Sequence, residues 1–218
     1  VDNRWQESEI GPFLASNLKL PSGPMIAKGL TVRLGNHGEA SAAYDTATAS
    51  FRAAWTGGFL KFDPARFGLI GAPRPATDPQ FVLPVDPAWG EARVILRGWR
   101  THGPRTVLEY DVAGMRVLEM PWADPTPAGV VILRDFSLGP RTSSVSFRMA
   151  ADAPAGVTPT LATERTEWTA PDGSEGVRET TRHSWTHEGR VHLTTVIGPL
   201  GPTRGVGSGV WVEVSPSP

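Results

Sequence analysis

The chain contains no cysteine. This absence excludes a disulfide, a thiol nucleophile, thiolate ligation of zinc or of an iron–sulfur cluster, and covalent attachment of a c-type haem. The sequence also lacks a Gly-x-Ser-x-Gly elbow, a phosphate-binding loop and a metal-binding cassette. We therefore predict no cofactor on this chain, and no motif identifies a catalytic residue or a metal ligand.

A surplus of charge and long apolar runs are missing as well. The 218 residues carry a formal net charge of −1, and only three of the 21 basic residues are lysines, Lys19, Lys28 and Lys61. Without a strong positive field, nucleic acid is not an expected partner. No apolar run approaches the roughly 20 residues that a membrane-spanning helix needs, so we expect no membrane span in this chain.

Glycine and proline are abundant, at 24 and 21 residues, and they recur between short runs in which apolar and polar residues alternate. This pattern is typical of an all-β protein. We predict an antiparallel β-sandwich, jelly-roll-like or supersandwich-like, that forms one domain over residues 1–214 and ends in a linker-like tail at 215–218. The Pro-rich residues 63–90 are predicted to be a long irregular loop covering one side, because each proline removes a backbone donor.

Several strand pairs follow from the alternation and the turn residues. Residues 30–34 and 40–45 are predicted to form a hairpin around a Gly-Asn-His-Gly turn. Residues 130–138 and 142–149 are expected to pair across Gly139 and Pro140. Residues 158–169 are expected to turn into 176–187, which then pairs with 190–197.

A turn predicted within residues 93–121 places a carboxylate on an apolar face. If Ala113-Gly114 is a two-residue turn, Asp111 lies opposite Arg116, and Leu108 lies opposite Glu119. An unpaired carboxylate on that face is costly, so Glu119 needs a partner or an open cleft. It is either a ligand-binding or acid/base group, or an edge residue in contact with water, or the register is shifted because Ala-Gly is a poor type I′ sequence.

A second turn, at Glu188-Gly189, gathers three of the five histidines on one strand pair. In this register His187 lies opposite Arg190, Trp185 opposite His192 and His183 opposite Thr194, while Val191 and Leu193 are left to pack on the core. Residues i and i+4 of one strand, such as His183 and His187, lie about 13 Å apart. This separation is too large for both side chains to bind one metal ion. Trp185, His183, His187 and His192 are therefore a candidate ligand surface for a sugar or a partner protein, or an ordinary solvated face.

Five segments carry a family resemblance through their order and spacing: residues 11–14, 28–35, 44–46, 55–60 and 103–121. Together they resemble an uncharacterised domain family of planctomycetes and verrucomicrobia, with the likeness covering about residues 10–150. In that family the domain stands in exported proteins beside a sorbosone-dehydrogenase-like propeller and a c-type cytochrome domain. The resemblance implies a periplasmic or otherwise extracytoplasmic location and a larger redox or cytochrome-containing partner complex. It implies no catalytic residue.

Three functional hypotheses follow. The first is a non-catalytic accessory or protein-interaction module of an extracytoplasmic electron-transfer or dehydrogenase assembly, by analogy with the family. The second is a carbohydrate-binding sandwich in which Trp185 stacks on a sugar ring of a polysaccharide. The third is a sugar-active enzyme in which Glu119 or Asp45 is a general acid or base.

Overall fold

The computed structural model describes residues 10–21, 23–68, 70–83, 88–127, 129–139, 145–150, 166–169, 175–179, 182–187, 190–200, 205–206 and 209–214. These residues form β-strands, connecting segments and one 3-10 turn, η2 (Ala65–Gly68). The strand pairs are antiparallel except for one short parallel pair. The predicted all-β, antiparallel fold is confirmed. In the part of the chain that the structure describes, no helix is long and apolar enough to cross a membrane.

The first sheet has six strands and begins with a meander of consecutive strands. Its order is β1 (Phe13–Leu18), β2 (Ile26–Leu34), β3 (Ala40–Asp45), β4 (Ser50–Trp55), β7 (Phe81–Val82) and β17 (Gly205–Val206). The predicted hairpin over residues 30–45 is confirmed as β2 and β3, with Leu34 opposite Ala40.

The second sheet has eight strands. Its order is β13 (Thr166–Thr169), β14 (Glu175–Glu179), β15 (Arg182–His187), β16 (Arg190–Leu200), β11 (Gly129–Leu138), β10 (Met115–Thr126), β9 (Arg105–Val112) and β8 (Val94–His102). Two small sheets complete the described strands: β12 (Val145–Ala150) with β18 (Gly209–Val214), and β5 (Leu60–Lys61) with β6 (Arg74–Pro75).

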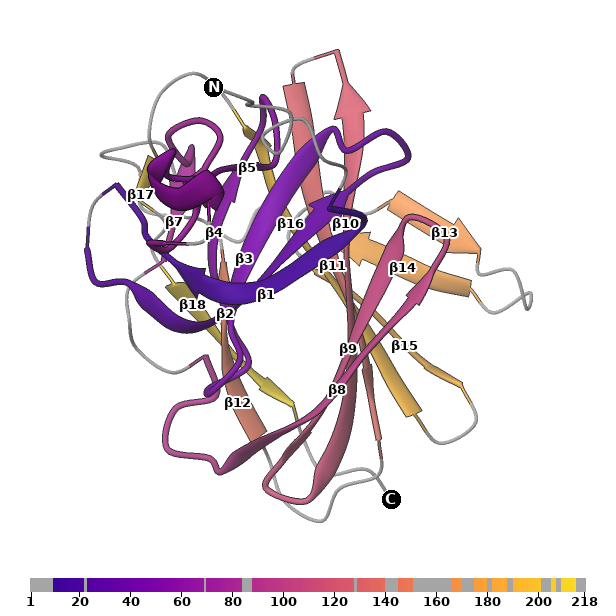
Figure 1. The fold of residues 1–218 in the computed structure, drawn as a ribbon. Coiled ribbons are helices and arrows are strands. Elements are labelled where there is room, and N and C mark those ends of the chain that lie inside the picture. The colour runs from indigo at the N-terminus through magenta and orange to yellow at the C-terminus, as the bar shows by residue number, and fades with distance from the viewer. Residues whose placement is uncertain are drawn as a thin grey trace.

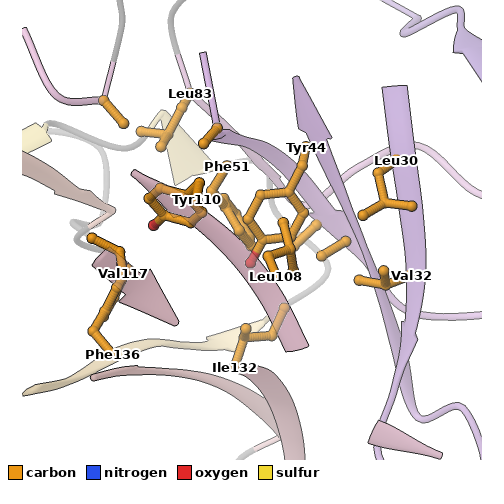
Figure 2. Packing of buried hydrophobic residues seen from close by; sticks show 14 of the residues in the cluster. Leu30, Val32, Tyr44, Phe51, Leu83, Leu108, Tyr110, Val117, Ile132 and Phe136 are labelled. Atoms are coloured by element: carbon orange, nitrogen blue, oxygen red, sulfur yellow. The ribbon is translucent and has the colours of Figure 1, made fainter. Parts of the chain in front are cut away.

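The two large sheets share one hydrophobic core. In Figure 1 the indigo and violet strands β1–β4 lie in front of the pink and yellow strands β10, β11 and β16. Side chains from both sheets meet between them, as Figure 2 shows for Tyr44 and Phe51 from the first sheet and Tyr110, Val117 and Phe136 from the second. Burial of these alternate, inward positions is the main favourable contribution to the stability of such a sandwich.

One predicted strand pairing is wrong, and one predicted strand is divided in two. Residues 130–138 do not pair with 142–149: β11 lies between β10 and β16, and β12 pairs with β18. The predicted strand 176–187 is divided into β14 and β15, which pair with each other, Val177 opposite Ser184. The neighbours predicted for this segment are confirmed, because β13 pairs with β14 and β15 pairs with β16. For residues 130–138 and 142–149 the alternation was identified correctly, but alternation does not specify which strand is the neighbour.

The Pro-rich segment at 63–90 is more ordered than predicted. It contains η2, β6 and β7, and β7 extends the first sheet beside β4. Three of its apolar side chains, Phe81, Leu83 and Trp89, are buried in the shared core. The described part of the segment therefore supplies core residues and a strand of the first sheet, which the sequence did not predict.

The double glycine after β4 marks a close approach of two segments. Gly57 and Gly58 have φ of 83° and 120°, and a Cβ atom on Gly58 would lie 2.9 Å from the Cβ of Ala76. The carbonyl of Gly58 also accepts a hydrogen bond from Nε1 of the buried Trp55 at 3.1 Å. Glycine is needed here because only a residue without a side chain permits both the positive φ and the contact.

Candidate functional site

The register predicted around Glu119 is confirmed. Asp111 lies opposite Arg116 and Leu108 opposite Glu119. Ala113 and Gly114 have φ of 48° and 87°, the two positive values that a type I′ turn requires. A shifted register therefore does not apply, although Ala is an unfavourable residue for this turn.

Glu119 lies in the interior between the sheets, with 0% of its surface exposed. Its Oε1 accepts hydrogen bonds from the Tyr44 hydroxyl at 2.8 Å and from Nε of Arg134 at 2.7 Å. Its Oε2 accepts one from the Tyr110 hydroxyl at 2.8 Å. Tyr44 belongs to the first sheet, so the carboxylate links the two sheets. An edge position in contact with water, one of the sequence-based interpretations, is excluded for Glu119.

Arg134 is the counter-charge of this buried cluster, which we call the Glu119 cluster: Glu119, Arg134, Tyr44 and Tyr110. The Cζ atom of Arg134 lies 4.9 Å from the ring centroids of both Phe51 and Phe136. A guanidinium between aromatic faces is stabilised by cation–π attraction. Its Nη1 atom has no hydrogen-bond partner among the residues that the structure describes. The positive charge is thus held by one carboxylate and two rings.

Burial and the neighbouring Glu119 charge raise the pKa of both Tyr44 and Tyr110 well above the usual value of 10. For Arg134, burial acts to lower the pKa, but the adjacent Glu119 carboxylate more than offsets this and the pKa is raised. The cluster therefore keeps both phenols neutral as donors and keeps the guanidinium charged. Such an arrangement stabilises a fixed carboxylate.

We expect stability to fall steeply above about pH 10 because of these two tyrosines. Above that pH the unfolded phenols lose their protons while the folded ones keep theirs, so each contributes a loss of about 1.4 kcal/mol per pH unit. Denaturant unfolding of the wild type between pH 9 and 11.5, compared with Tyr44→Phe and Tyr110→Phe, measures the slopes. Each substitution should reduce the slope. An unchanged slope in both variants would contradict the buried, neutral state of the phenols.

The second predicted carboxylate, Asp45, lies at the end of β3. Its Oδ1 accepts the backbone N–H of Ala47 at 2.9 Å, and its Oδ2 lies 3.9 Å from Nη1 of Arg52. The contacts of Asp45 are those of a turn residue with a nearby cation. An acid/base role for either carboxylate stays a prediction.

The register predicted for the histidine-rich strands is confirmed. Trp185 lies opposite His192, His183 opposite Thr194 and His187 opposite Arg190. The side chains of these residues lie outside what the structure describes, so the proposed ligand-binding role of Trp185, His183, His187 and His192 stays a prediction. Among the residues whose surroundings are described, no group of three His, Asp or Glu side chains is placed to hold a metal ion.

The pairing extends this row across the large sheet, a relation that the sequence did not reveal. His192 lies opposite Ser137, Ser137 opposite Leu118, and Leu118 opposite Glu109. Residues directly opposite one another share a face of an antiparallel sheet. The face that Ser137, Leu118 and Glu109 share is the one turned away from the Glu119 cluster, and we call it the outer surface.

The described part of the outer surface combines charge with half-buried apolar side chains. Asp111 binds two arginines: its carboxylate oxygens accept hydrogen bonds from Nε of Arg97 at 2.8 Å and from Nε of Arg116 at 2.7 Å. Glu109 likewise pairs with Arg100 and Arg116. Hydrogen bonding from Arg97, with that of Arg116, holds the pKa of Asp111 below its usual value. The half-buried apolar residues of the same face include Val107, Leu118, Met120 and Leu133.

An aromatic residue completes the outer surface beside these charges. The Cζ atom of Arg105 lies 4.2 Å from the ring centroid of Trp122, whose Nε1 donates to Asp124 at 3.0 Å. Trp122 and Met120 alternate with the inward residues of β10, so both belong to the outer surface. This surface therefore presents arginine and methionine above a tryptophan that is only 7% exposed.

The sequence analysis did not assign Glu119 its partners, although one signal was available. In β11 the inward positions are Ile132, Arg134, Phe136 and Leu138, so Arg134 is the only cation on an apolar stripe. A buried cation requires a buried anion, and Glu119 was the carboxylate predicted on an apolar face. Tyr44 could not be found this way, because it lies 75 residues away in the other sheet.

A family model described as a domain of unknown function (DUF6797) matches residues 42–119. The matched stretch contains Tyr44, Tyr110 and Glu119, and it ends before Arg134. No significant match was found among curated proteins or among solved structures. Residues 42–119 of this chain are thus similar to an uncharacterised domain family.

Proposed function

We propose that the protein is a non-catalytic interaction module of an extracytoplasmic electron-transfer or dehydrogenase assembly, and that its outer surface binds a larger, haem-bearing protein of that assembly. The observation that carries the proposal is the composition of the outer surface. Half-buried Leu118, Met120 and Leu133 adjoin arginines that are already bound to carboxylates. The location and the kind of partner rest on the family resemblance of residues 10–150.

The residue types favour a protein partner. Arginine, methionine and aromatic residues are enriched in protein interfaces, and apolar residues at the centre with a charged rim are typical of them. The ion pairs of Glu109 and Asp111 fix three arginines in place, which lowers the entropy that they lose when a partner binds. A sugar-binding face is more often built on exposed aromatic platforms with few charges. The described outer aromatic, Trp122, is covered by Arg105.

The glutamate buried in the core is consistent with this reading. The three donors bound to the Glu119 carboxylate, the hydroxyls of Tyr44 and Tyr110 and Nε of Arg134, all belong to the Glu119 cluster. The carboxylate thereby connects the sheets, and its contribution is to hold the scaffold that displays the outer surface. A rigid scaffold with a functional face is the usual division of roles in a binding module.

We expect Leu118→Lys to remove the partner and leave the fold intact. A lysine at this position lies opposite Glu109, so it is tolerated in the free protein, but it places a charge at the centre of an apolar contact. Native purification from the source, with a visible absorption spectrum, should recover a haem-bearing companion with the wild type. The recovery should fall at least about tenfold with Leu118→Lys.

The matched control is Met25→Lys. Met25 is an apolar residue that is 49% exposed and lies in the connection between β1 and β2 of the first sheet. Met25→Lys therefore makes the same change away from the outer surface. Met25→Lys should retain the companion. Equal recovery with both variants, or no haem band with the wild type, would contradict the proposal. Retention on a polysaccharide column that Leu118→Lys abolishes, without any companion, would favour the carbohydrate-binding function in its place.

A further inference from the structure

One pocket of this molecule lies away from both the outer surface and the Glu119 cluster. It has a volume of about 640 Å³ and lies beside the small β5–β6 sheet at the end of β1. Cavities of roughly 300–1,000 Å³ are the usual size of small-molecule sites. The polar side chains that line it are Lys19, Lys61, Arg74, Asp63, Thr77 and Asp78.

Three cations converge on this pocket although the chain is poor in lysine. Lys61 and Arg74 lie directly opposite each other in the β5–β6 pair. The backbone N–H of Lys19 donates to the carbonyl of Pro73, the residue before Arg74, at 2.9 Å, and this bond brings the third cation alongside. Two of the three lysines in the whole chain thus line one cavity.

Two of these cations, Lys61 and Arg74, form an unfavourable like-charge pair across the strands. Like charges directly opposite each other in a sheet repel, and no ion pair joins Lys19, Lys61 or Arg74 to a carboxylate within the described residues. A bound anion would reduce the repulsion between Lys61 and Arg74 and would also attract Lys19. The convergence of cations in one cavity therefore favours an anionic ligand.

The remaining lining groups are acceptors and hydroxyls. Asp63 and Asp78 add two carboxylates, so the lining keeps one net positive charge. The Oδ1 atom of Asp63 accepts the backbone N–H of Ala65 at 2.8 Å, which fixes this carboxylate at the rim. Carboxylates that face a ligand accept hydrogen bonds from its hydroxyl groups. The lining therefore fits a molecule that carries an anionic group and hydroxyl groups together.

We propose that the pocket formed by Lys19, Lys61, Arg74, Asp63 and Asp78 is a binding site for a hydroxylated carboxylic acid. The carboxylate of the ligand binds the three cations, and its hydroxyls donate to the aspartates. This site is independent of the proposed interaction surface, because it uses different residues and a different kind of ligand. The acid is either a free sugar acid or the acidic unit at the end of a polysaccharide.

The experiment is isothermal titration calorimetry at low ionic strength with four probes. Glucuronate has both the carboxylate and the hydroxyls, acetate has only the carboxylate, glucose has only the hydroxyls, and an oligogalacturonate presents the acid within a polymer. We expect glucuronate or the oligogalacturonate to bind at least tenfold more tightly than acetate and glucose. Tighter binding of glucuronate indicates a free acid, and tighter binding of the oligogalacturonate indicates a polysaccharide end.

Two variants test the residues. Lys61→Gln should weaken binding of the preferred acid at least tenfold and should leave the melting temperature unchanged or raised, because it removes a like-charge pair. Lys28→Gln changes the third lysine, which is exposed on β2 and outside the pocket, and should have no effect. Equal affinities for acetate and glucuronate, equal losses in both variants, or no detectable binding of any acid would each overturn the proposal.

Discussion

We expect Glu119→Gln to lower the free energy of unfolding by about 3–5 kcal/mol, the cost of leaving a buried charge without its partner. The substitution keeps the shape of the side chain but removes the negative charge that compensates Arg134, whose side chain is 2% exposed. The amide group also replaces one acceptor oxygen with a donor, opposite either a tyrosine hydroxyl or the guanidinium. Urea unfolding at pH 7 measures the loss.

The matched control is Glu109→Gln, the same change one strand away on the outer surface. Glu109 pairs with Arg100 and Arg116, whose side chains are 78% and 45% exposed, so solvent compensates the loss of the charge. Exposed pairs of this kind contribute about 0–1 kcal/mol. Losses of similar size in Glu109→Gln and Glu119→Gln would contradict a structural role for the buried carboxylate.

Coupling between the two buried charges gives an independent check of the same prediction. Arg134→Met removes the cation and keeps an apolar side chain between the rings of Phe51 and Phe136. The double variant Glu119→Gln with Arg134→Met leaves no buried charge unpaired. It should therefore lose about 1–3 kcal/mol less than the sum of the two single losses.

Phe51→Ala is the second large effect, and we expect it to destabilise the protein by about 3–5 kcal/mol. Phe51 is 1% exposed, and its ring centroid lies 5.3 Å from that of Tyr44 and 5.9 Å from that of Phe81. The same ring covers one face of Arg134. Truncation therefore opens a cavity and removes a cation–π contact from a charge that lacks a full set of hydrogen bonds. Thermal and urea unfolding measure the effect.

Phe51→Leu distinguishes the cavity from the ring. Leucine fills most of the space, so this variant should lose only about 1–2 kcal/mol, the part that belongs to the aromatic contacts. The remaining difference between the leucine and alanine variants reports the cavity. If both variants lost the same amount, packing volume at Phe51 would not be the main contribution, and the prediction would be wrong.

Local pattern predicted most of the strands, and it predicted the register where a short turn joins two of them. The alternation of Leu30, Val32 and Leu34 indicated β2, and a two-residue turn at Ala113-Gly114 placed Glu119 on the inward face. The same reasoning at residues 188–189 placed Trp185 opposite His192. These predictions succeeded because a side-chain period of two and a fixed turn length leave one register for a hairpin.

Pairings between strands that are distant in sequence were not predictable in the same way. The order of the large sheet joins β11 to β16, and β12 pairs with β18 rather than with β11. An alternating strand presents the same backbone groups to any neighbour, so its pattern specifies a face and not a partner. Residues 130–138 and 142–149 were consequently assigned to the wrong pair.

The sequence by itself determined the all-β class, the absence of any cysteine-dependent chemistry and the inward position of Glu119. Only the tertiary structure decided that Glu119 is bound by Arg134 and Tyr44, and that Lys61, Arg74 and Lys19 meet in one pocket. The physical reason is sequence separation. Alternation and turns determine the arrangement only of residues that are close to each other in the chain. The partners of a buried charge are set by how two sheets pack, which brings together residues as far apart as 75 positions.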